Sequence, residues 1–392
     1  MPPPDPKKAL VILAHTPPPH HGQSLMVALL LEALKEPSTG ALAPGVFHVD
    51  CRYSDDLKSM GRPGLHKLFL ALRYALQTLA IRFRHGTATL YYVPAPGKHA
   101  AFLRDCVVLS LLRPFFRRIV FQWHAAGLSE WLENRAWKVE RWIGRALFAD
   151  NALSIVQLDE KVADASYFHP REIRVIPYGI PDPCPDFALP AERSPGAPIR
   201  LLFLSMATRK KGVFAAVSAW QRLNERASEN KDPLYHLSIA GEFPDAAEER
   251  EFHEFLRKAR ADVSRKNPAA AEHGCDVEIL GSVRGERKTA SYAEADIFLF
   301  PSTYPWESFG VVLAEAAHFG LPCVTYQPLV GPNGLSPEYH RRVASGDLEA
   351  FVAAIKSVMP GRSAKIRADA LAKFSVKLFN ERMRAALSEA AA

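Results

Sequence analysis

Residues 296–316 read Asp296-Ile-Phe-Leu-Phe-Pro-Ser-Thr-Tyr-Pro-Trp-Glu307-Ser-Phe-Gly-Val-Val-Leu-Ala-Glu315-Ala316, and this stretch decides the fold. The apolar run after Asp296 predicts a buried strand, a Pro/Ser turn follows it, and a helix is expected to start near Ser308 or Phe309. The first amides of such a helix are unpaired and carry its positive dipole, so this unit can hold a diphosphate. Glu307 would lie just before the helix and Glu315 about two turns inside it. The two carboxylates can accept hydrogen bonds from sugar hydroxyls, or they can be ordinary exposed helical glutamates.

Similar apolar runs lie on both sides of this stretch. They occupy residues 9–14, 90–93, 119–123, 152–156 and 173–176 in the first half, and 199–204, 237–240, 277–280, 297–300 and 323–326 in the second. Continuous apolar runs are typical of strands buried on both faces of a parallel sheet. Because helical stretches separate them, we expect an α/β protein with two Rossmann-like, doubly wound domains.

A proline-rich stretch without periodicity separates the two series of strands. It predicts an N-terminal domain over residues 1–182, a linker over 183–198 and a C-terminal domain over 199–374. Residues 375–392 are expected to form a C-terminal helix that can pack back on the N-terminal domain.

The composition is that of a globular protein, with 48% hydrophobic and 23% charged residues among 392. The apolar run near the N-terminus is too short for the core of a signal peptide, and no run of apolar residues is long enough to span a bilayer. The five cysteines are far apart and no pair has metal-ligand spacing, so we expect reduced thiols and no bound metal. A cytoplasmic location is therefore expected.

Positive charge is concentrated in residues 51–120, which hold twelve Lys or Arg and three Asp, whereas the whole chain has a net charge of +7. Such a segment suggests an anionic partner, which can be membrane lipid, a phosphorylated acceptor or nucleic acid, or else a solvated basic face. Within it, 65–84 predicts a helix that is either a core element or a membrane-facing one. Residues 112–118 look like a loop that combines aromatic and cationic groups suited to an anionic membrane or an acceptor, namely Arg113, Phe115, Phe116, Arg117 and Arg118.

The stretch from Glu307 to Glu315 resembles the Glu-x7-Glu motif of the retaining glycosyltransferases of family 4. Other segments follow in the order of that family: His-Gly-Gln-Ser at 21–24, Trp-His-Ala-Ala-Gly-Leu at 123–128, Ile-Pro-Tyr-Gly-Ile at 176–180, Lys-Lys-Gly-Val at 210–213, Ile-Ala-Gly-Glu at 239–242 and Leu-Gly-Ser-Val at 280–283. The resemblance covers residues 9–385. It implies the GT-B fold, in which two facing Rossmann-like domains enclose a cleft, with the acceptor on the N-terminal side.

The resemblance also implies roles for several residues on the donor side. Glu315 would bind the ribose hydroxyls of a nucleotide-sugar donor, and Glu307 would lie beside the transferred sugar. The backbone of Ser308, Phe309 and Gly310 would approach sugar and phosphate. The backbone at Val283 would contact the base.

A cation near the departing diphosphate would stabilise the negative charge that grows as the glycosidic bond breaks, and Lys211 is the candidate. Many members of the family place an arginine five residues earlier, where this chain has Met206. Arg209 or Lys210 can replace that arginine, or one cation can suffice. Lys211 can also be part of a solvent-facing basic turn.

Two further candidates lie where the carboxyl edge of the N-terminal sheet is expected. His124 ends a predicted strand, and the resemblance implies contact with the donor sugar, although a lone histidine can be structural. Gly22 follows the first strand, and its backbone can approach phosphate or acceptor, or it can be a plain turn glycine. The adjacent His20 and His21 have no metal-ligand spacing.

Taken together, these features predict a retaining, metal-independent hexosyltransferase. We expect transfer from a UDP- or GDP-linked sugar to a hydroxyl of a glycan or lipid-linked acceptor, in polysaccharide assembly at the inner face of the cell membrane. Two alternatives stay open: a non-catalytic nucleotide-sugar-binding protein of the same fold, and a Rossmann-type oxidoreductase. The second lacks support, because the loop after the first strand has no Gly-x-Gly-x-x-Gly motif. No motif for nucleic-acid binding accompanies the basic segment.

Overall fold

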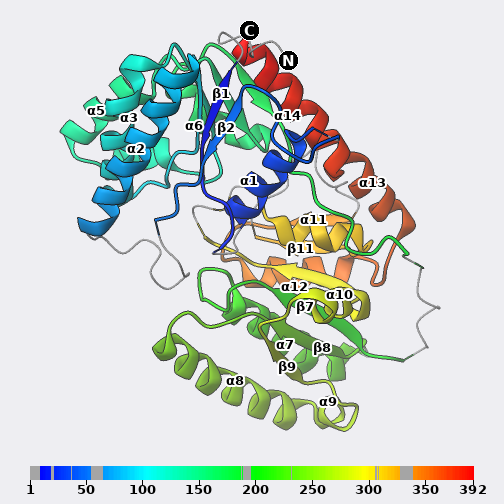
Figure 1. Cartoon of the computed structure of the whole chain (residues 1–392). Helices are drawn as coiled ribbons and strands as arrows, with labels where there is room; N and C mark the ends of the chain where they lie inside the picture. The colour runs from blue at the N-terminus through cyan, green and yellow to red at the C-terminus, as the bar shows by residue number, and fades with distance from the viewer. Residues whose placement is uncertain are drawn as a thin grey trace. The chain divides into compact units, whose positions relative to one another are not determined.

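A computed structural model describes residues 9–18, 22–36, 38–53, 65–186, 188, 196–230, 232–304, 307, 309–326 and 339–392. The chain divides into two compact units, each built around one six-stranded parallel sheet (Figure 1). The first unit consists of Met1–Gly179, Pro305–Phe309 and Val376–Ala392, and the second of Ile180–Tyr304 and Gly310–Ser375. The predicted doubly wound α/β fold is confirmed. None of the helices in the described part is both long and apolar enough to span a bilayer.

The sheet of the first unit has the strand order β2-β1-β3-β4-β5-β6. Its strands are β1 (Leu10–Leu13), β2 (Val46–Val49), β3 (Thr89–Tyr92), β4 (Arg118–Gln122), β5 (Leu153–Val156) and β6 (Ile173–Val175). Every residue of β1, β3 and β5 is buried, because helices cover both faces of the sheet. This is the reason for their continuous apolar sequences.

Three helices cover one face of this sheet: α2 (Leu65–His85), α3 (His99–Leu112) and α5 (Lys138–Phe148) (Figure 1). The other face carries α1 (Gly22–Ala33) and the C-terminal helix α14 (Val376–Ala391), which packs on α1 and on β4. Arg118 donates hydrogen bonds of 3.0 Å to the carbonyl oxygens of Ala391 and Ala392. The shorter elements of the unit are η1 (Arg113–Phe115), α4 (Leu128–Asn134), η2 (Asp159–Lys161) and α6 (Val162–Ser166).

The sheet of the second unit has the strand order β12-β11-β10-β7-β8-β9. Its strands are β7 (Ile199–Leu204), β8 (Tyr235–Ala240), β9 (Val277–Gly281), β10 (Ile297–Phe300), β11 (Cys323–Thr325) and β12 (His340–Arg342). Residues 187 and 189–195 of the predicted linker lie outside the described residues.

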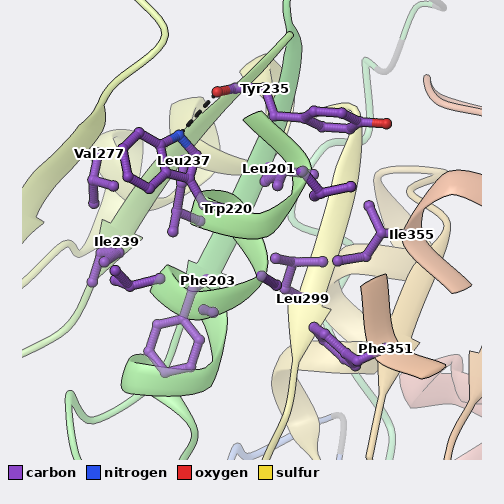
Figure 2. Packing of buried hydrophobic residues seen from close by; sticks show 14 of the residues in the cluster. Leu201, Phe203, Trp220, Tyr235, Leu237, Ile239, Val277, Leu299, Phe351 and Ile355 are labelled. Atoms are coloured by element: carbon purple, nitrogen blue, oxygen red, sulfur yellow. Dashed lines mark hydrogen bonds between the residues drawn. The ribbon is translucent and has the colours of Figure 1, made fainter. Parts of the chain in front are cut away.

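One face of the second sheet packs against α7 (Val213–Asn230), α8 (Ala246–Lys266) and α12 (Leu348–Ser357). Figure 2 shows this core, in which side chains of β7 and β8 surround Trp220. The buried indole N–H of Trp220 donates a hydrogen bond of 3.0 Å to the carbonyl oxygen of Tyr235, so the largest side chain of the core leaves no polar atom unpaired. The remaining helices are α9 (Pro268–Glu272), α10 (Gly285–Glu294), α11 (Val311–His318) and α13 (Ala364–Phe374).

Candidate functional site

The second sheet has a topological switch point between β7 and β10. These strands lie side by side, and the chain continues from β7 towards β8 and β9 but from β10 towards β11 and β12. The loops that follow β7 and β10 therefore diverge from a common point at the carboxyl edge. In open α/β sheets this is where ligands bind.

The two loops at the switch point are fastened to each other. The amide of Thr303 donates a hydrogen bond of 2.8 Å to the carbonyl oxygen of Lys210, and the ammonium of Lys211 lies 4.4 Å from the centre of the Tyr304 ring. Gly212 has a φ of +97°, and a Cβ at this position would lie 2.1 Å from the carbonyl oxygen of Pro301. The close approach therefore requires glycine. It holds Lys211 beside the loop that leads to Glu307.

The neighbouring cation, Arg209, contacts a different element. Its guanidinium lies 3.7 Å from the centre of the Phe214 ring and donates a hydrogen bond of 2.6 Å to Glu251 on α8. Met206 is exposed on the same loop. Both side chains belong to the loop after β7, and of the two it is Lys211 that contacts the loop after β10.

The helix that carries Glu315 begins later than predicted. It starts at Val311, because Gly310 before it takes a left-handed conformation with a φ of 71° that no helical residue has. Glu315 is consequently its fifth residue, about one turn inside and not two. Gly310 stands at the N-cap position and has no side chain that could accept a hydrogen bond from the first amides of α11.

The carboxylate of Glu315 is held by two donors from α10. Lys288 donates a hydrogen bond of 2.6 Å to one oxygen, and the hydroxyl of Tyr292 donates one of 2.9 Å to the other. Burial raises the pKa of Tyr292, and the adjacent Glu315 charge raises it further, so the hydroxyl keeps its proton. Val283 lies half-buried in the loop that leads into α10.

Sequence reasoning missed Lys288 and Tyr292. Their one signal is a spacing of four on a helix, which places two side chains on one face without saying what lies opposite.

A second group of candidate residues belongs to the first unit. His124 follows β4 and is buried; its Nδ1 shares a hydrogen bond with the hydroxyl of Tyr178, and the two rings stack with centroids 5.5 Å apart. The ring of Tyr178 in turn lies 4.9 Å from that of Phe309, which is also buried. Tyr178 is part of the Ile-Pro-Tyr-Gly-Ile segment, but nothing in the sequence alone assigned it a role.

The turn after His124 is fixed by a buried carboxylate. Gly127 has a φ of +83°, and its amide donates a hydrogen bond of 2.6 Å to Asp164. Asp164 also accepts from the amide of Ser129 at 2.9 Å. These contacts hold the imidazole of His124 at the carboxyl edge of the first sheet.

Glu307 is half-buried and lies close enough to Lys161 for their charges to interact. Burial lowers the pKa of Lys161, and the carboxylates of Asp164, Glu160 and Glu307 partly oppose this, in decreasing order. Gly22 is the first, exposed residue of α1.

Some candidates lie outside the described residues, namely Ser308, His20 and His21. Among the described residues, no three His, Cys, Asp or Glu side chains are grouped as metal ligands would be.

The basic segment before β4 differs from the expected loop. Arg113 donates hydrogen bonds to two backbone carbonyls at the end of α5, and Arg118 to those of the last two residues of the chain. The prediction that this segment presents both phenylalanines to a membrane or an acceptor is wrong for Phe116, which is buried in the core of the first unit. Phe115 and Arg117 are exposed.

Two kinds of comparison relate this chain to known proteins: one of its sequence with protein-family models, and one of its structure with solved structures. Residues 187–373 match the family model described as glycosyl transferases group 1. The lipopolysaccharide outer core galactosyltransferase WaaB superposes with a TM-score of 0.64 at 14% identity, over 96% of this chain and 98% of that one. HepE from Anabaena in complex with UDP superposes with a TM-score of 0.61 at 14% identity, over 97% and 100% of the two chains. Sucrose-phosphate synthase from Thermosynechococcus elongatus reaches 0.58 at 18%, over 96% and 94%.

At these identities the structural matches establish the fold, which is GT-B. No curated protein matches the chain in sequence. The protein is a glycosyltransferase, and its residues 187–373 form a domain of the group 1 family.

Proposed function

We propose that the protein transfers a hexose from a nucleoside-diphosphate sugar to a hydroxyl of a glycan or lipid-linked acceptor, with retention of configuration at the transferred carbon. The observation that carries this proposal is the contact between the two loops at the switch point of the second unit. Lys211 lies on the loop after β7, and the loop after β10, which it contacts, leads to α11. A solved structure of the same fold, HepE from Anabaena, holds UDP-glucose.

Glu315 is suited to bind the donor ribose. A carboxylate has about four acceptor positions on its two oxygens. Lys288 occupies one on the first oxygen and Tyr292 one on the second, so each oxygen keeps a position for a ribose hydroxyl. The two donors also fix the carboxylate in one orientation, which lowers the entropic cost of binding.

Lys211 would act on the leaving group. Negative charge develops on the diphosphate as the bond to the sugar breaks, and an ammonium placed beforehand stabilises that charge without reorganisation. The amides at the start of α11 would contribute in the same sense. The departing diphosphate itself would take the proton from the attacking hydroxyl, so no enzymic nucleophile is required.

Glu307 and His124 would contact the transferred sugar. Glu307 would stabilise positive charge at the anomeric carbon, and the bond between Tyr178 and Nδ1 would fix the ring of His124. We further propose that the reaction is independent of metal ions. Its setting would be polysaccharide assembly at the cytoplasmic face of a membrane.

Thermal unfolding in the presence of nucleotides tests the donor site. UDP or GDP should raise the melting temperature by roughly 5–10 °C at about 100 times its Kd, because ligands that bind the native state stabilise it. Uridine, which lacks the diphosphate, should give a much smaller shift, and EDTA should leave the UDP effect unchanged.

The same experiment separates the alternatives. If no nucleoside diphosphate shifts the transition at millimolar concentration, the proposal is wrong. Stabilisation without hydrolysis or transfer of any UDP-, GDP- or ADP-sugar would instead favour a non-catalytic nucleotide-sugar-binding protein.

A further inference from the structure

Helix α2 buries small side chains on its inner face and exposes several large apolar ones, while Tyr74, Leu79 and Ile81 pack partly buried against the core. Ala71, Ala75 and Thr78, at the spacing of one helix face, are fully buried against the first sheet and its other helices. Phe69 and Leu76, on the opposite face, are 65% and 54% exposed. A surface helix of a globular protein normally has the reverse arrangement. The outer face of α2 is therefore a candidate interaction surface.

The exposed apolar side chains continue over the neighbouring helices. α3 packs between α2 and α5, so the three form one layer (Figure 1). We define the apolar layer by six of its exposed residues: Phe69, Leu76 and Phe83 on α2, Leu103 on α3, Trp137 just before α5 and Trp142 on it. Trp142 is 72% exposed. Exposed apolar side chains gathered over one layer of helices in this way mark an interaction site.

The segment that carries the apolar layer is also strongly basic. Residues 65–148 contain thirteen Lys or Arg and four Asp or Glu. Asp105 is buried and paired with Arg104, and Glu140 is buried beside His99, so the other side chains of this segment keep an excess of positive charge. The partner must consequently be apolar and negatively charged at once.

An anionic bilayer has both properties. Leucine and phenylalanine enter the boundary between headgroups and acyl chains, tryptophan prefers the interface, and Lys and Arg attract anionic headgroups. A second copy of the chain fits less well, because its apolar layer would bring the same excess of positive charge. We propose that the apolar layer of the first unit docks on the surface of a membrane that contains anionic lipid.

The position of the layer is consistent with a lipid-linked acceptor, and in this respect the inference rests on the proposed function. In a parallel sheet, each covering helix starts near the carboxyl ends of the strands and leads back to their amino ends. Phe69, Leu103 and Trp142 all lie in the first half of their helices. They are thus near the edge that carries His124 and Tyr178, which docking would bring close to the headgroups.

Flotation with vesicles of equal parts phosphatidylcholine and phosphatidylglycerol tests the docking surface. The full chain should float with these vesicles at low salt and much less with pure phosphatidylcholine. The reason is that electrostatic attraction between the basic side chains and the anionic headgroups, which salt would screen, contributes to binding. The variant Phe69→Ser/Leu76→Ser/Phe83→Ser should bind at least about tenfold more weakly, since three large apolar groups no longer leave water. All three side chains are more than half exposed, so folding should be intact. Met359→Ser removes an apolar side chain that is 87% exposed in the second unit and should bind like the unchanged protein.

Three results would overturn the inference: no flotation of the unchanged protein, equal flotation of the triple variant, or a fall from dimer to monomer in the triple variant without any vesicle binding. The last would identify a second copy as the partner. UDP should stabilise the triple variant as it stabilises the unchanged protein, and this measurement separates the docking surface from the donor site. If UDP stabilises the protein and vesicles do not bind it, the docking surface is wrong and the donor site stands.

Discussion

Replacing Lys288 by methionine tests whether this residue acts on the donor through Glu315. Methionine keeps much of the side-chain length and removes the charge and the donors. Glu315 then loses the hydrogen bond of 2.6 Å from Lys288 and keeps the one from Tyr292. We expect a weaker hold on the ribose, and hence a higher Kd for UDP and a higher donor KM.

The size of the effect follows from the exposure of the pair. The side chain of Lys288 is 33% exposed and that of Glu315 16%, so the pair lies between a surface ion pair and a buried one. Surface pairs contribute up to about 1 kcal/mol and hydrogen bonds to charged groups about 1.5–3 kcal/mol. A loss near 1.4 kcal/mol corresponds to about a tenfold rise in Kd. The kcat should change little, because ribose contacts are the same before and during the reaction.

Calorimetric titration of UDP into four proteins gives the test: the unchanged chain, Lys288→Met, Glu315→Ala and the double variant. If Lys288 acts only by orienting Glu315, its replacement has no further effect once Glu315 is alanine. Lys356 and Asp232 form an ion pair of comparable exposure elsewhere in the second unit, so Lys356→Met should leave the Kd unchanged.

Two outcomes would refute the reasoning. Additive losses in the double variant would mean that Lys288 contacts the nucleotide itself. An unchanged Kd in folded Lys288→Met would mean that Tyr292 alone is sufficient to orient the carboxylate.

Two further predictions concern catalysis and stability. Lys211→Ala should lower kcat by on the order of 100- to 1,000-fold with a smaller effect on donor binding, since the negative charge near Lys211 grows only as the glycosidic bond breaks. Single-turnover assays test this. If the two folded single variants Lys211→Ala and Glu307→Gln both react at near-normal rates, the proposed mechanism is wrong. Burial, and then the charge of Arg342, lowers the pKa of His340 from 6.5 to about 4, so its unfolded form takes up a proton first as the pH falls. The contribution of His340 to the free energy of unfolding should thus be highest above pH 6.5 and fall by about 3 kcal/mol towards pH 4. Urea titrations at several pH values measure this. If the free energy of unfolding of His340→Gln depends on pH as steeply as that of the unchanged protein, the prediction is wrong.

The fold could be predicted from the sequence wherever strands are buried on both faces. The runs at 199–204 and 297–300 coincide with β7 and β10. The two strands outside the predicted runs, β2 and β12, lie at sheet edges and pair on one side only. β2 is half-buried over most of its length and β12 has the sequence His-Arg-Arg, so neither has a continuous apolar run. Edge strands depend on a neighbour that their own residues do not specify.

The candidate site could be predicted only in its local parts. Lys211 follows the predicted strand 199–204, and Glu315 follows the predicted strand 297–300. Their roles, in catalysis for Lys211 and in donor binding for Glu315, stay predictions. The donors on Glu315 and the contact between His124 and Tyr178 depend on how distant segments pack. Phe116 shows the limit of composition: arginines flank it, but Arg118 binds backbone carbonyls and the ring is free to enter the core.

The first unit is assembled from chain segments that are far apart in the sequence, and this has a consequence for synthesis on the ribosome. The helices of the second unit lie between its strands or soon after β12 in the sequence, so this unit can be completed while translation continues. The first sheet is made early, but α14, which packs on β4 and α1, is translated only after the second unit. The apolar side chains of α14, such as Phe379 and Met383, reach their buried positions only then. Until α14 has been made, the face of the nascent N-terminal sheet that carries α1 lacks the rest of its cover and is exposed to chaperones and to other unfinished chains.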